Sequence, residues 1–267
     1  MFDRMDPERL RRSYEADGLL TSAYDLAKVD IIPELRRDIP MYQMEIRRNR
    51  SQGLFRVPYI LTQAIITAAH DENILRVVRA ILGTDELIMW GPNIQVGTPN
   101  EAGLWHTDIE SWLWSTITVV VGLRGCSEDN ATLCIPHSQR LPVQPWAIAD
   151  NTKSAAVLEA AQALDQRCHE IRTFEGFQNG RFYLFNAKCW HTGLEGKSGD
   201  RELLFLHYDK AANPRIPYMK DYEERSWFDF PATYIKVDAE KSFEVEHALY
   251  SVEGKDYVGA VPPNSRM

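Results

Sequence analysis

Through the first third of the chain, apolar residues recur at intervals of three and four, which is the spacing of amphipathic helices. The run Glu8–Asp17 is predicted as a helix that ends at Gly18, since glycine commonly terminates helices. The charged segment Pro33–Arg50 predicts a weaker helix, because Pro40 interrupts it. The most regular pattern covers Tyr59–Leu82 and predicts one helix with a single apolar face.

Further along, the apolar positions form short runs rich in Val, Ile, Thr, Phe and Tyr, mostly separated by Gly, Pro, Asn or Asp. Such runs are typical of strands. The predicted strands are Leu87–Val96, Thr116–Leu123, Leu133–Ile135, Glu170–Phe174, Arg181–Phe185 and Glu202–Tyr208. One predicted helix, Ser154–Cys168, interrupts the series, and the tail from Trp227 onward carries little pattern. Most gaps between strands are too short to hold a crossover helix, which argues against a doubly wound parallel sheet.

These elements predict a mainly β fold with flanking helices, built around a β-sandwich or barrel core. The 267 residues contain no internal repeat and no low-complexity linker, and a length of this order suits one barrel domain. We therefore expect a single domain over residues 1–267. Its parts are an N-terminal helical part (1–86), a β core (87–210) and a C-terminal extension (211–267).

Charge and composition restrict the partners. The chain has 30 Lys and Arg against 38 Asp and Glu, a net charge of −8. Without a basic block, an acidic chain is a poor binder of nucleic acid and of anionic membranes. The N-terminus has no apolar signal region and no apolar run is long enough to span a bilayer, so we expect a cytoplasmic protein. Four cysteines without a C-x-x-C pair are expected to be reduced and mostly buried. Nothing in the sequence indicates the oligomeric state.

Two histidines carry the chemistry. His106 and Asp108 are two residues apart, so on extended chain both side chains point to the same face. His191 follows a predicted strand 85 residues later. Two imidazoles and one carboxylate form the facial triad of non-haem Fe(II) oxygenases, which leaves open positions for co-substrate and O₂. The spacing alone also allows an ordinary core or rim histidine at position 191.

Arg201 adds a second observation. It stands ten residues after His191 and opens the predicted strand Glu202–Tyr208. An arginine at the mouth of an apolar barrel strand is costly unless it meets an anion, and its planar fork suits a carboxylate. A small dicarboxylate would reach from a metal to Arg201. Neighbouring acidic residues allow the alternative of a surface arginine.

Four segments between about residues 87 and 209 occur in a recognisable order. They are Trp105-His106-Thr107-Asp108, the run from Glu128 to Gln139 ending in Pro136-His137-Ser138-Gln139, the turn and strand from Asn179 to Phe185 followed by His191, and Arg201 with the strand that ends at Tyr208. This order and spacing resemble the phytanoyl-CoA dioxygenase family of Fe(II)/2-oxoglutarate-dependent oxygenases.

The resemblance implies a double-stranded β-helix core (a jelly roll, cupin-like). It implies that His106, Asp108 and His191 hold Fe(II), and that 2-oxoglutarate chelates this metal and meets Arg201 with its far carboxylate. With O₂, such an enzyme hydroxylates an unactivated C–H bond and releases succinate and CO₂. From the breadth of the family we expect a small-molecule substrate: a natural-product intermediate, an amino acid or a sugar.

The sequence departs from the family at two places. The family's Pro-Gly-Ser-His corner reads Pro136-His137-Ser138-Gln139 here, and Gly193 stands where members often have Ser or Thr. These changes bear on co-substrate binding rather than on the metal. Asp108 is present where related halogenases have Gly or Ala, so the resemblance implies oxygenation and not halogenation.

Further site residues are expected near this centre. The candidates for co-substrate contacts are Gln95, Thr118 and Thr192. Those for substrate contacts are Trp112, Trp105 and His137. For Gln95 and Thr118 ordinary strand polarity is the alternative, and some of the indoles are expected to cap the barrel core instead. His207 shares a face with Arg201 by the period of two, and we interpret it as a hydrogen-bonded structural histidine.

Three alternatives stay open at the level of function. The same cofactor chemistry also gives desaturation, cyclisation or epimerisation. A non-catalytic barrel that binds a metal or ligand is a different class of protein, although no ligand of the triad is missing. A cupin-like metal enzyme without 2-oxoglutarate is disfavoured by Arg201 at the family spacing.

Overall fold

The computed structural model describes residues 6–51, 62–96, 103–108, 116–193, 201–212, 232–237, 243–250 and 256–257. The described α-helices are α1 (Pro7–Asp17), α2 (Ile32–Ser51), α3 (Gln63–Ala69), α4 (Glu72–Leu82) and α5 (Ser154–Leu164). The described strands are β1 (Leu19–Asp25), β2 (Leu87–Val96), β3 (Ile117–Arg124), β4 (Leu133–Cys134), β5 (Arg181–Asn186), β6 (His191–Thr192), β7 (Glu202–Lys210), β8 (Ala232–Val237), β9 (Phe243–Tyr250) and β10 (Asp256–Tyr257). None of the helices in these ranges is long and apolar enough to cross a membrane.

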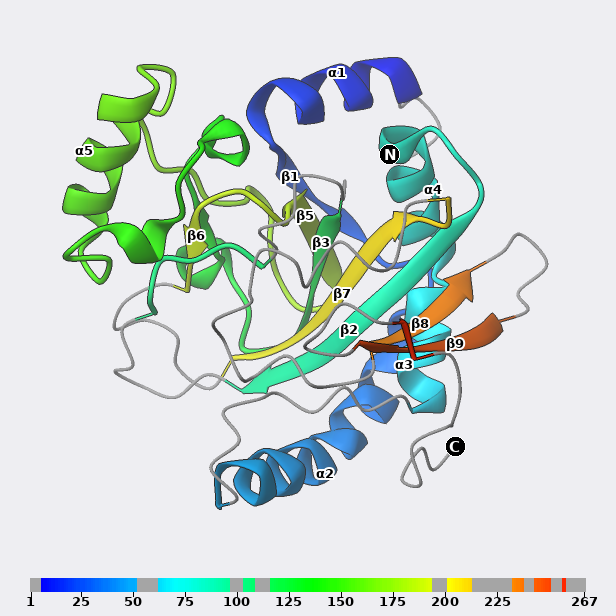
Figure 1. The fold of residues 1–267 in the computed structure, drawn as a ribbon. Coiled ribbons are helices and arrows are strands. Elements are labelled where there is room, and N and C mark those ends of the chain that lie inside the picture. Colours follow the sequence, from blue (N-terminus) through cyan, green and yellow to red (C-terminus); the bar gives the residue numbers. More distant parts are fainter. Residues whose placement is uncertain are drawn as a thin grey trace.

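The strands form one large and one small sheet (Figure 1). In the large sheet the order is β1-β5-β3-β7-β2-β8-β9-β10, and β4 pairs with β6 in the small sheet. Every described strand pair is antiparallel. The predicted fold class, mainly β with flanking helices, is therefore confirmed.

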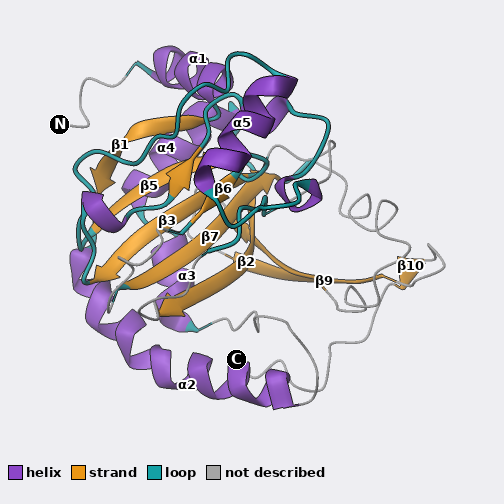
Figure 2. Ribbon diagram, turned by 90° about the vertical axis from the view of Figure 1, so that its left-hand side faces the viewer, coloured by secondary structure: helices purple, strands orange, loops and turns teal. Residues whose placement is uncertain are grey.

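The two faces of the large sheet pack against different layers, because successive side chains of a strand point to opposite sides. On β3, Val119 and Val121 join the core cluster that includes buried residues of α1, α2, α3 and α4. Val120 joins a second cluster on the opposite face, together with Phe185 of β5. Figure 1 shows β6 and α5 on one side of the large sheet and α3 and α4 on the other. In the turned view of Figure 2 the central strands lie side by side between these layers.

The long helix predicted over Tyr59–Leu82 is wrong, because the structure has two shorter helices there, and residues 59–61 lie outside the described chain. The break is at Asp71, whose carboxylate accepts from the backbone N–H groups of Asn73 and Ile74 as the N-cap of α4. Its second oxygen accepts from the N–H groups of Ala27 and Lys28. A side chain that caps a helix and also holds a distant loop gives no apolar period, so the pattern alone could not reveal the break.

The expected interruption at Pro40 is also wrong, since α2 runs on through it. Pro40 removes one backbone hydrogen bond, but Leu35, Ile39 and Tyr42 are all buried in the core. Packing of an amphipathic face supplies most of the stability of a helix in a protein, and here it outweighs the local break.

Both ends of the chain contribute strands that the pattern did not predict. Within the N-terminal part expected to be helical, β1 forms one edge of the large sheet, with Leu19 opposite Phe185. At the other edge β8, β9 and β10 extend the sheet from a tail that carried little pattern. The predicted strand Glu170–Phe174 is reduced to a single bridge between Cys134 and Arg172. All four cysteines are free, as expected.

Candidate metal centre

Backbone hydrogen bonds bring the two histidines of the predicted triad together. His106 and His191 form an antiparallel bridge in which each N–H donates to the other's carbonyl, at 2.9 and 3.0 Å. Two residues on, the N–H of Asp108 donates to the carbonyl of Ala187 at 2.8 Å. The His106–Asp108 segment is therefore held along the chain that joins β5 to β6, although it belongs to neither sheet.

The three side chains meet at one point. Asp108 Oδ1 lies 3.4 Å from His191 Nε2 and 3.9 Å from His106 Nε2. One ligand atom from each of the three residues lies within 4.8 Å of the other two. Donors about 2.1 Å from one ion lie roughly 3 Å apart, so small side-chain adjustments would close this set around a metal. Two imidazoles and one carboxylate are the donor set of non-haem Fe(II) sites.

The second nitrogen of each imidazole fixes which nitrogen faces the centre. His106 Nδ1 lies 2.7 Å from the carbonyl of Leu104, and His191 Nδ1 lies 2.9 Å from the carbonyl of Cys189. A carbonyl only accepts, so Nδ1 carries the hydrogen in both rings. In a neutral ring this leaves the lone pair on Nε2, the nitrogen beside Asp108, which is the arrangement that a metal-ligating histidine requires.

Burial differs strongly among the three ligands. The side chain of His191 is 4% exposed and that of Asp108 is 16% exposed, whereas that of His106 is 49% exposed. In the described part of the chain the centre is therefore sealed on the His191 side and open on the His106 side.

The charges in the centre suit metal binding at two of the three ligands, His106 and Asp108. Partial removal from water, and then the nearby His191, lower the pKa of His106 to about 4. Burial raises the pKa of Asp108, but His191 and His207 outweigh it and hold that pKa well below its usual range. Burial lowers the pKa of His191, but Asp108 and the Cys189 carbonyl outweigh it and raise that pKa. At neutral pH His106 is neutral and Asp108 is charged, as ligands must be.

Arg201 lies immediately before β7 with only 7% of its surface exposed, and its guanidinium donates to the carbonyl of Asn130. Gly193 leaves room for it, because a Cβ at this position would lie 3.0 Å from a guanidinium nitrogen. The departure from the family at Gly193 thus accompanies the close approach of the arginine. Thr192, which precedes Gly193, is buried, and its hydroxyl donates to the Gly193 carbonyl.

The two remaining co-substrate candidates lie on β3 and β2, the two strands that flank β7 in the large sheet. Thr118 donates its hydroxyl hydrogen to Asp108 Oδ2 at 2.5 Å, so its donor is engaged by the candidate metal ligand instead of being free for a co-substrate. Gln95 is exposed on β2 and lies opposite Leu203 of β7, two residues from Arg201.

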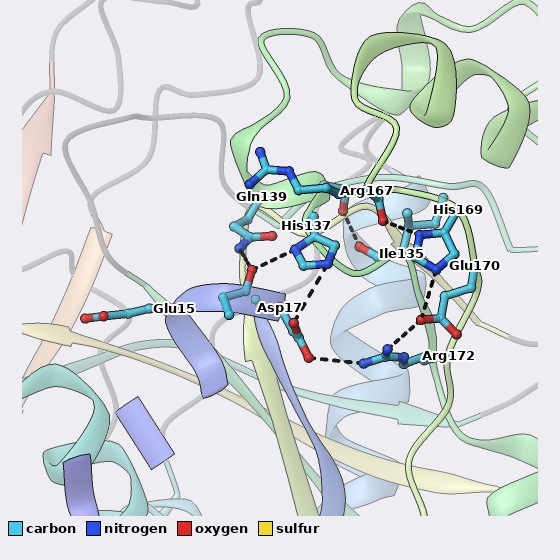
Figure 3. Close-up of polar contacts among 12 residues, drawn as sticks. Glu15, Asp17, Ile135, His137, Gln139, Arg167, His169, Glu170 and Arg172 are labelled. Atoms are coloured by element: carbon cyan, nitrogen blue, oxygen red, sulfur yellow. Dashed lines mark hydrogen bonds and ion pairs between the residues drawn. The ribbon is translucent and has the colours of Figure 1, made fainter. Parts of the chain in front are cut away.

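Of the three expected substrate residues, the structure describes Trp105 and His137, and both have contacts elsewhere in the fold. Trp105 is fully buried in the cluster that includes residues of α5, and its indole N–H donates to the Ser154 hydroxyl at 3.3 Å, which favours the core position considered above. His137 holds the end of α1: its Nδ1 lies 2.8 Å from the Ala16 carbonyl (Figure 3). Trp112 lies outside the described residues.

His137 stands in the place of the family's corner glycine, and its backbone keeps the conformation of a glycine. Its φ of 68° is the only positive φ of a non-glycine residue in the described ranges. The corner also binds the last turn of α1 through the N–H of His137, which donates to the Asp17 carbonyl, and through Arg140, which donates to the Glu15 carbonyl. This region is a helix-docking corner rather than part of the metal centre.

Two further residues, His207 and Asn93, lie on the face of the large sheet that carries Thr118, and neither was predicted to have a functional role. His207 Nε2 lies 3.6 Å from Asp108 Oδ2, so this histidine contacts the centre. Asn93 lies opposite Phe205 on the same face, and its buried amide oxygen has no hydrogen-bond partner among the described residues. The period of two places His207 on the face of Arg201, but only the fold shows that Asp108 faces it.

Comparison with known families agrees with this geometry. The family model of phytanoyl-CoA dioxygenase (PhyH) matches residues 37–202, more than half of the chain, and this range includes His106, Asp108, His191 and Arg201. The protein belongs to the PhyH family. No curated protein sequence matches this PhyH member.

Solved structures share the fold of this PhyH protein at low sequence identity. EctD from S. alaskensis with bound Fe is 18% identical, with a TM-score of 0.52 over 80% of each chain. The carbocyclase SnoK from nogalamycin biosynthesis, described as non-haem and α-ketoglutarate-dependent, is 14% identical, with a TM-score of 0.53 over 82% of this chain and 90% of its own. The epimerase SnoN from the same biosynthesis, described in the same terms, is 15% identical, with a TM-score of 0.51 over 77% and 83%.

Proposed function

We propose that this protein is an Fe(II)/2-oxoglutarate-dependent dioxygenase that hydroxylates an unactivated C–H bond of a small molecule and releases succinate and CO₂. The observation that carries the proposal is the convergence of His106, Asp108 and His191, with one ligand atom from each within 4.8 Å of the others. Membership of the PhyH family supports the same chemistry. When bound, iron and 2-oxoglutarate together supply the oxidising power, since protein side chains alone do not activate O₂.

The protein's own residues hold and orient these groups. His106 Nε2, His191 Nε2 and Asp108 Oδ1 are the proposed ligands, since these atoms face one another. Three protein ligands leave three positions of an octahedral ion open, two for the co-substrate and one for O₂. The buried side of the centre, around His191, excludes water, and the open side at His106 admits the reactants.

Arg201 is the proposed partner of the far carboxylate of 2-oxoglutarate. Its guanidinium is buried, and within the described ranges no Asp or Glu forms an ion pair with it. A buried cation requires an anion or several hydrogen bonds, and the planar fork of arginine suits a carboxylate. The amide oxygen of Asn93 and the side chain of Gln95 lie on the same face and are proposed as further polar contacts.

Other outcomes of the same chemistry are also candidates, because an epimerase and a carbocyclase share the fold of this protein. Desaturation, cyclisation or epimerisation would use the same residues and differ in the fate of the substrate radical. A small molecule is the proposed substrate class, with neither nucleic acid nor membrane as partner. A non-catalytic barrel would hold the metal but form no succinate.

Anaerobic titration with Fe(II) and 2-oxoglutarate tests the proposal. We expect a metal-to-ligand charge-transfer band in the wild-type protein and its loss in His106→Ala. His169→Ala is a matched control, because this histidine is also largely exposed but contacts Glu170 on the surface. Absence of the band in folded wild-type protein would overturn the proposal. Product analysis with candidate substrates then separates hydroxylation from the other outcomes.

A further inference from the structure

The two oxygens of Asp108 have different surroundings. Oδ1 faces the two imidazoles of the candidate triad, at 3.4 Å from His191 and 3.9 Å from His106. Oδ2 faces the opposite way, toward the hydroxyl of Thr118 at 2.5 Å and Nε2 of His207 at 3.6 Å. One carboxylate oxygen therefore faces the metal position, and the other faces two side chains of the large sheet.

We propose that Thr118 and His207 are positioning residues that hold Oδ2 of Asp108, so that the carboxylate offers a metal only Oδ1. This inference rests on the proposed function, since it concerns how the same centre binds its ion. It adds two residues outside the ligand triad and gives each a stated action on one atom.

The two residues are well placed for this action. Thr118 on β3 and His207 on β7 are direct partners across the ladder, so their side chains lie next to each other on one face. Both are buried, with 0% and 8% of their surface exposed. They belong to the centre of the large sheet, which is among the most rigid parts of such a fold.

Asp108, in contrast, lies outside every named strand. One backbone hydrogen bond, from its N–H to the Ala187 carbonyl, attaches it to the β5–β6 connection. That bond places the residue but does not set the rotation of its carboxylate. The two side chains of the sheet therefore supply the orientation that the backbone leaves free.

The groups around Asp108 Oδ2 determine whether this oxygen can bind a metal. The threonine hydroxyl has a single hydrogen and gives it to Oδ2. A carboxylate only accepts, so His207 must carry its hydrogen on Nε2 to interact favourably with Oδ2. With the Thr118 hydrogen bond and the nearby His207 on its side, Oδ2 is less accessible to a metal than Oδ1.

The consequence concerns the number of open positions on the metal. Carboxylates bind metals through one oxygen or through both. If Asp108 used both, the protein would fill four positions of an octahedral ion and leave two. The proposed reaction requires three, two for 2-oxoglutarate and one for O₂.

Mn(II) is a suitable probe, because the proton relaxivity of bound Mn(II) increases with the number of water molecules on the ion. We expect Thr118→Val and His207→Phe to reduce the relaxivity at full occupancy, and the double variant to reduce it by about a third, the change from three open positions to two. The dissociation constant of Mn(II) should rise by about 10–100-fold, as is usual when the partner of a metal ligand is removed. The dissociation constant of 2-oxoglutarate on the Mn(II) protein should rise as well.

Matched variants separate this role from a structural one. Thr118→Ser and His207→Gln keep a donor and should restore the wild-type relaxivity. Thr116→Val is the control, because Thr116 is buried two residues away on the same face and donates to Asp209 at 3.4 Å. It should leave Mn(II) affinity and relaxivity unchanged.

Each result decides between the alternatives. Unchanged relaxivity of the Mn(II)-saturated double variant overturns the inference, even if the variant is less stable, while the wild-type binding still supports the proposed function. If the double variant does not fold, the single variants carry the same test. Wild-type protein that binds no Mn(II) and no Fe(II) overturns the proposed function itself, and the inference with it.

Discussion

The two faces of the large sheet consist of the same strands but differ in composition, because one is apolar and the other combines an apolar cluster with buried polar and charged groups. On β7, Leu204, Leu206 and Tyr208 belong to the apolar cluster that packs against the helices. The alternate residues on the other face include His207 and are preceded by Arg201. The helix-covered face gains stability by excluding water. The other face also packs apolar residues such as Phe205, but beside them it buries charged and polar groups, which is favourable only when these meet one another or a ligand.

Replacing Leu206 by Ala should show the largest effect on stability. This side chain is fully buried on the helix-covered face, and such truncations cost about 2–5 kcal/mol of unfolding free energy. Urea denaturation measures the loss. Below the unfolding transition, the Fe(II) and 2-oxoglutarate affinities should stay within about twofold, because packing on this face does not touch the ligands. A large loss of metal affinity in the folded variant would show that the two faces are coupled.

Replacing Arg201 by Ala should show the reverse pattern. A charge-assisted interaction with a carboxylate contributes about 1.5–3 kcal/mol, so the dissociation constant of 2-oxoglutarate should rise about 10–100-fold. Fe(II) affinity without co-substrate should change little. Calorimetric titration of the metal-loaded protein measures both, and Arg124→Ala, which removes an arginine from the ion pair with Glu202 on the same sheet, is the control. An unchanged 2-oxoglutarate affinity would show that Arg201 has another role.

Acidification should weaken metal binding through His191. The pKa of this histidine is raised, so a metal ion must displace its proton as the pH falls below that pKa, and affinity should drop by up to about tenfold per pH unit. His106 does not compete in this range, because its pKa is about 4. Competition titrations with a fluorescent chelator at several pH values measure the slope. An affinity independent of pH between about 5.5 and 7.5 would contradict the protonated His191–Asp108 pair.

The same pair makes the stability of the metal-free protein depend on pH. The contribution of His191 is full below the unfolded pKa of about 6.5 and is lost as the pH rises through its raised folded value. That of Asp108 is present above about pH 4 and is lost as the pH falls through its lowered folded value. Thermal unfolding across this range should therefore show metal stabilising the protein most on the alkaline side.

Replacing Trp105 by Phe should show the smallest effect. The change removes the indole N–H that donates to Ser154 and some buried volume, which should cost about 1–2 kcal/mol of stability. Because Trp105 is buried in the core, the KM values for substrate and 2-oxoglutarate should stay the same. Steady-state kinetics with an accepted substrate measure this, and a raised substrate KM at unchanged kcat would place the indole at the pocket.

The sequence predicted the strands of the core better than the helices around it. β2 has the predicted bounds, Leu87–Val96, because a short run rich in apolar residues indicates a strand that is buried in the sheet. The break at Asp71 is made by polar N-cap bonds that do not alter the apolar period, and the continuity of α2 through Pro40 depends on packing against the core. No local period contains that information.

The same limit holds for the site. The triad followed from residue types, spacing and family resemblance, and the structure brings His106, Asp108 and His191 together. Thr118 was placed near the centre, but its partner there, Asp108, was not predicted. Which side chains contact Asp108 depends on tertiary packing, which the order of residues along the chain does not specify.

The corner after β4 gives the first helix an influence on a site that it does not touch. At one end, Cys134 pairs with His191, and the N–H of Ile135 donates to the carbonyl of Trp190. At the other end, His137 holds the final carbonyls of α1 (Figure 3). Deleting the first seventeen residues would therefore remove contacts that support β4 and, through it, β6 with its proposed ligand His191. The affinity for iron should then depend on whether α1 is present.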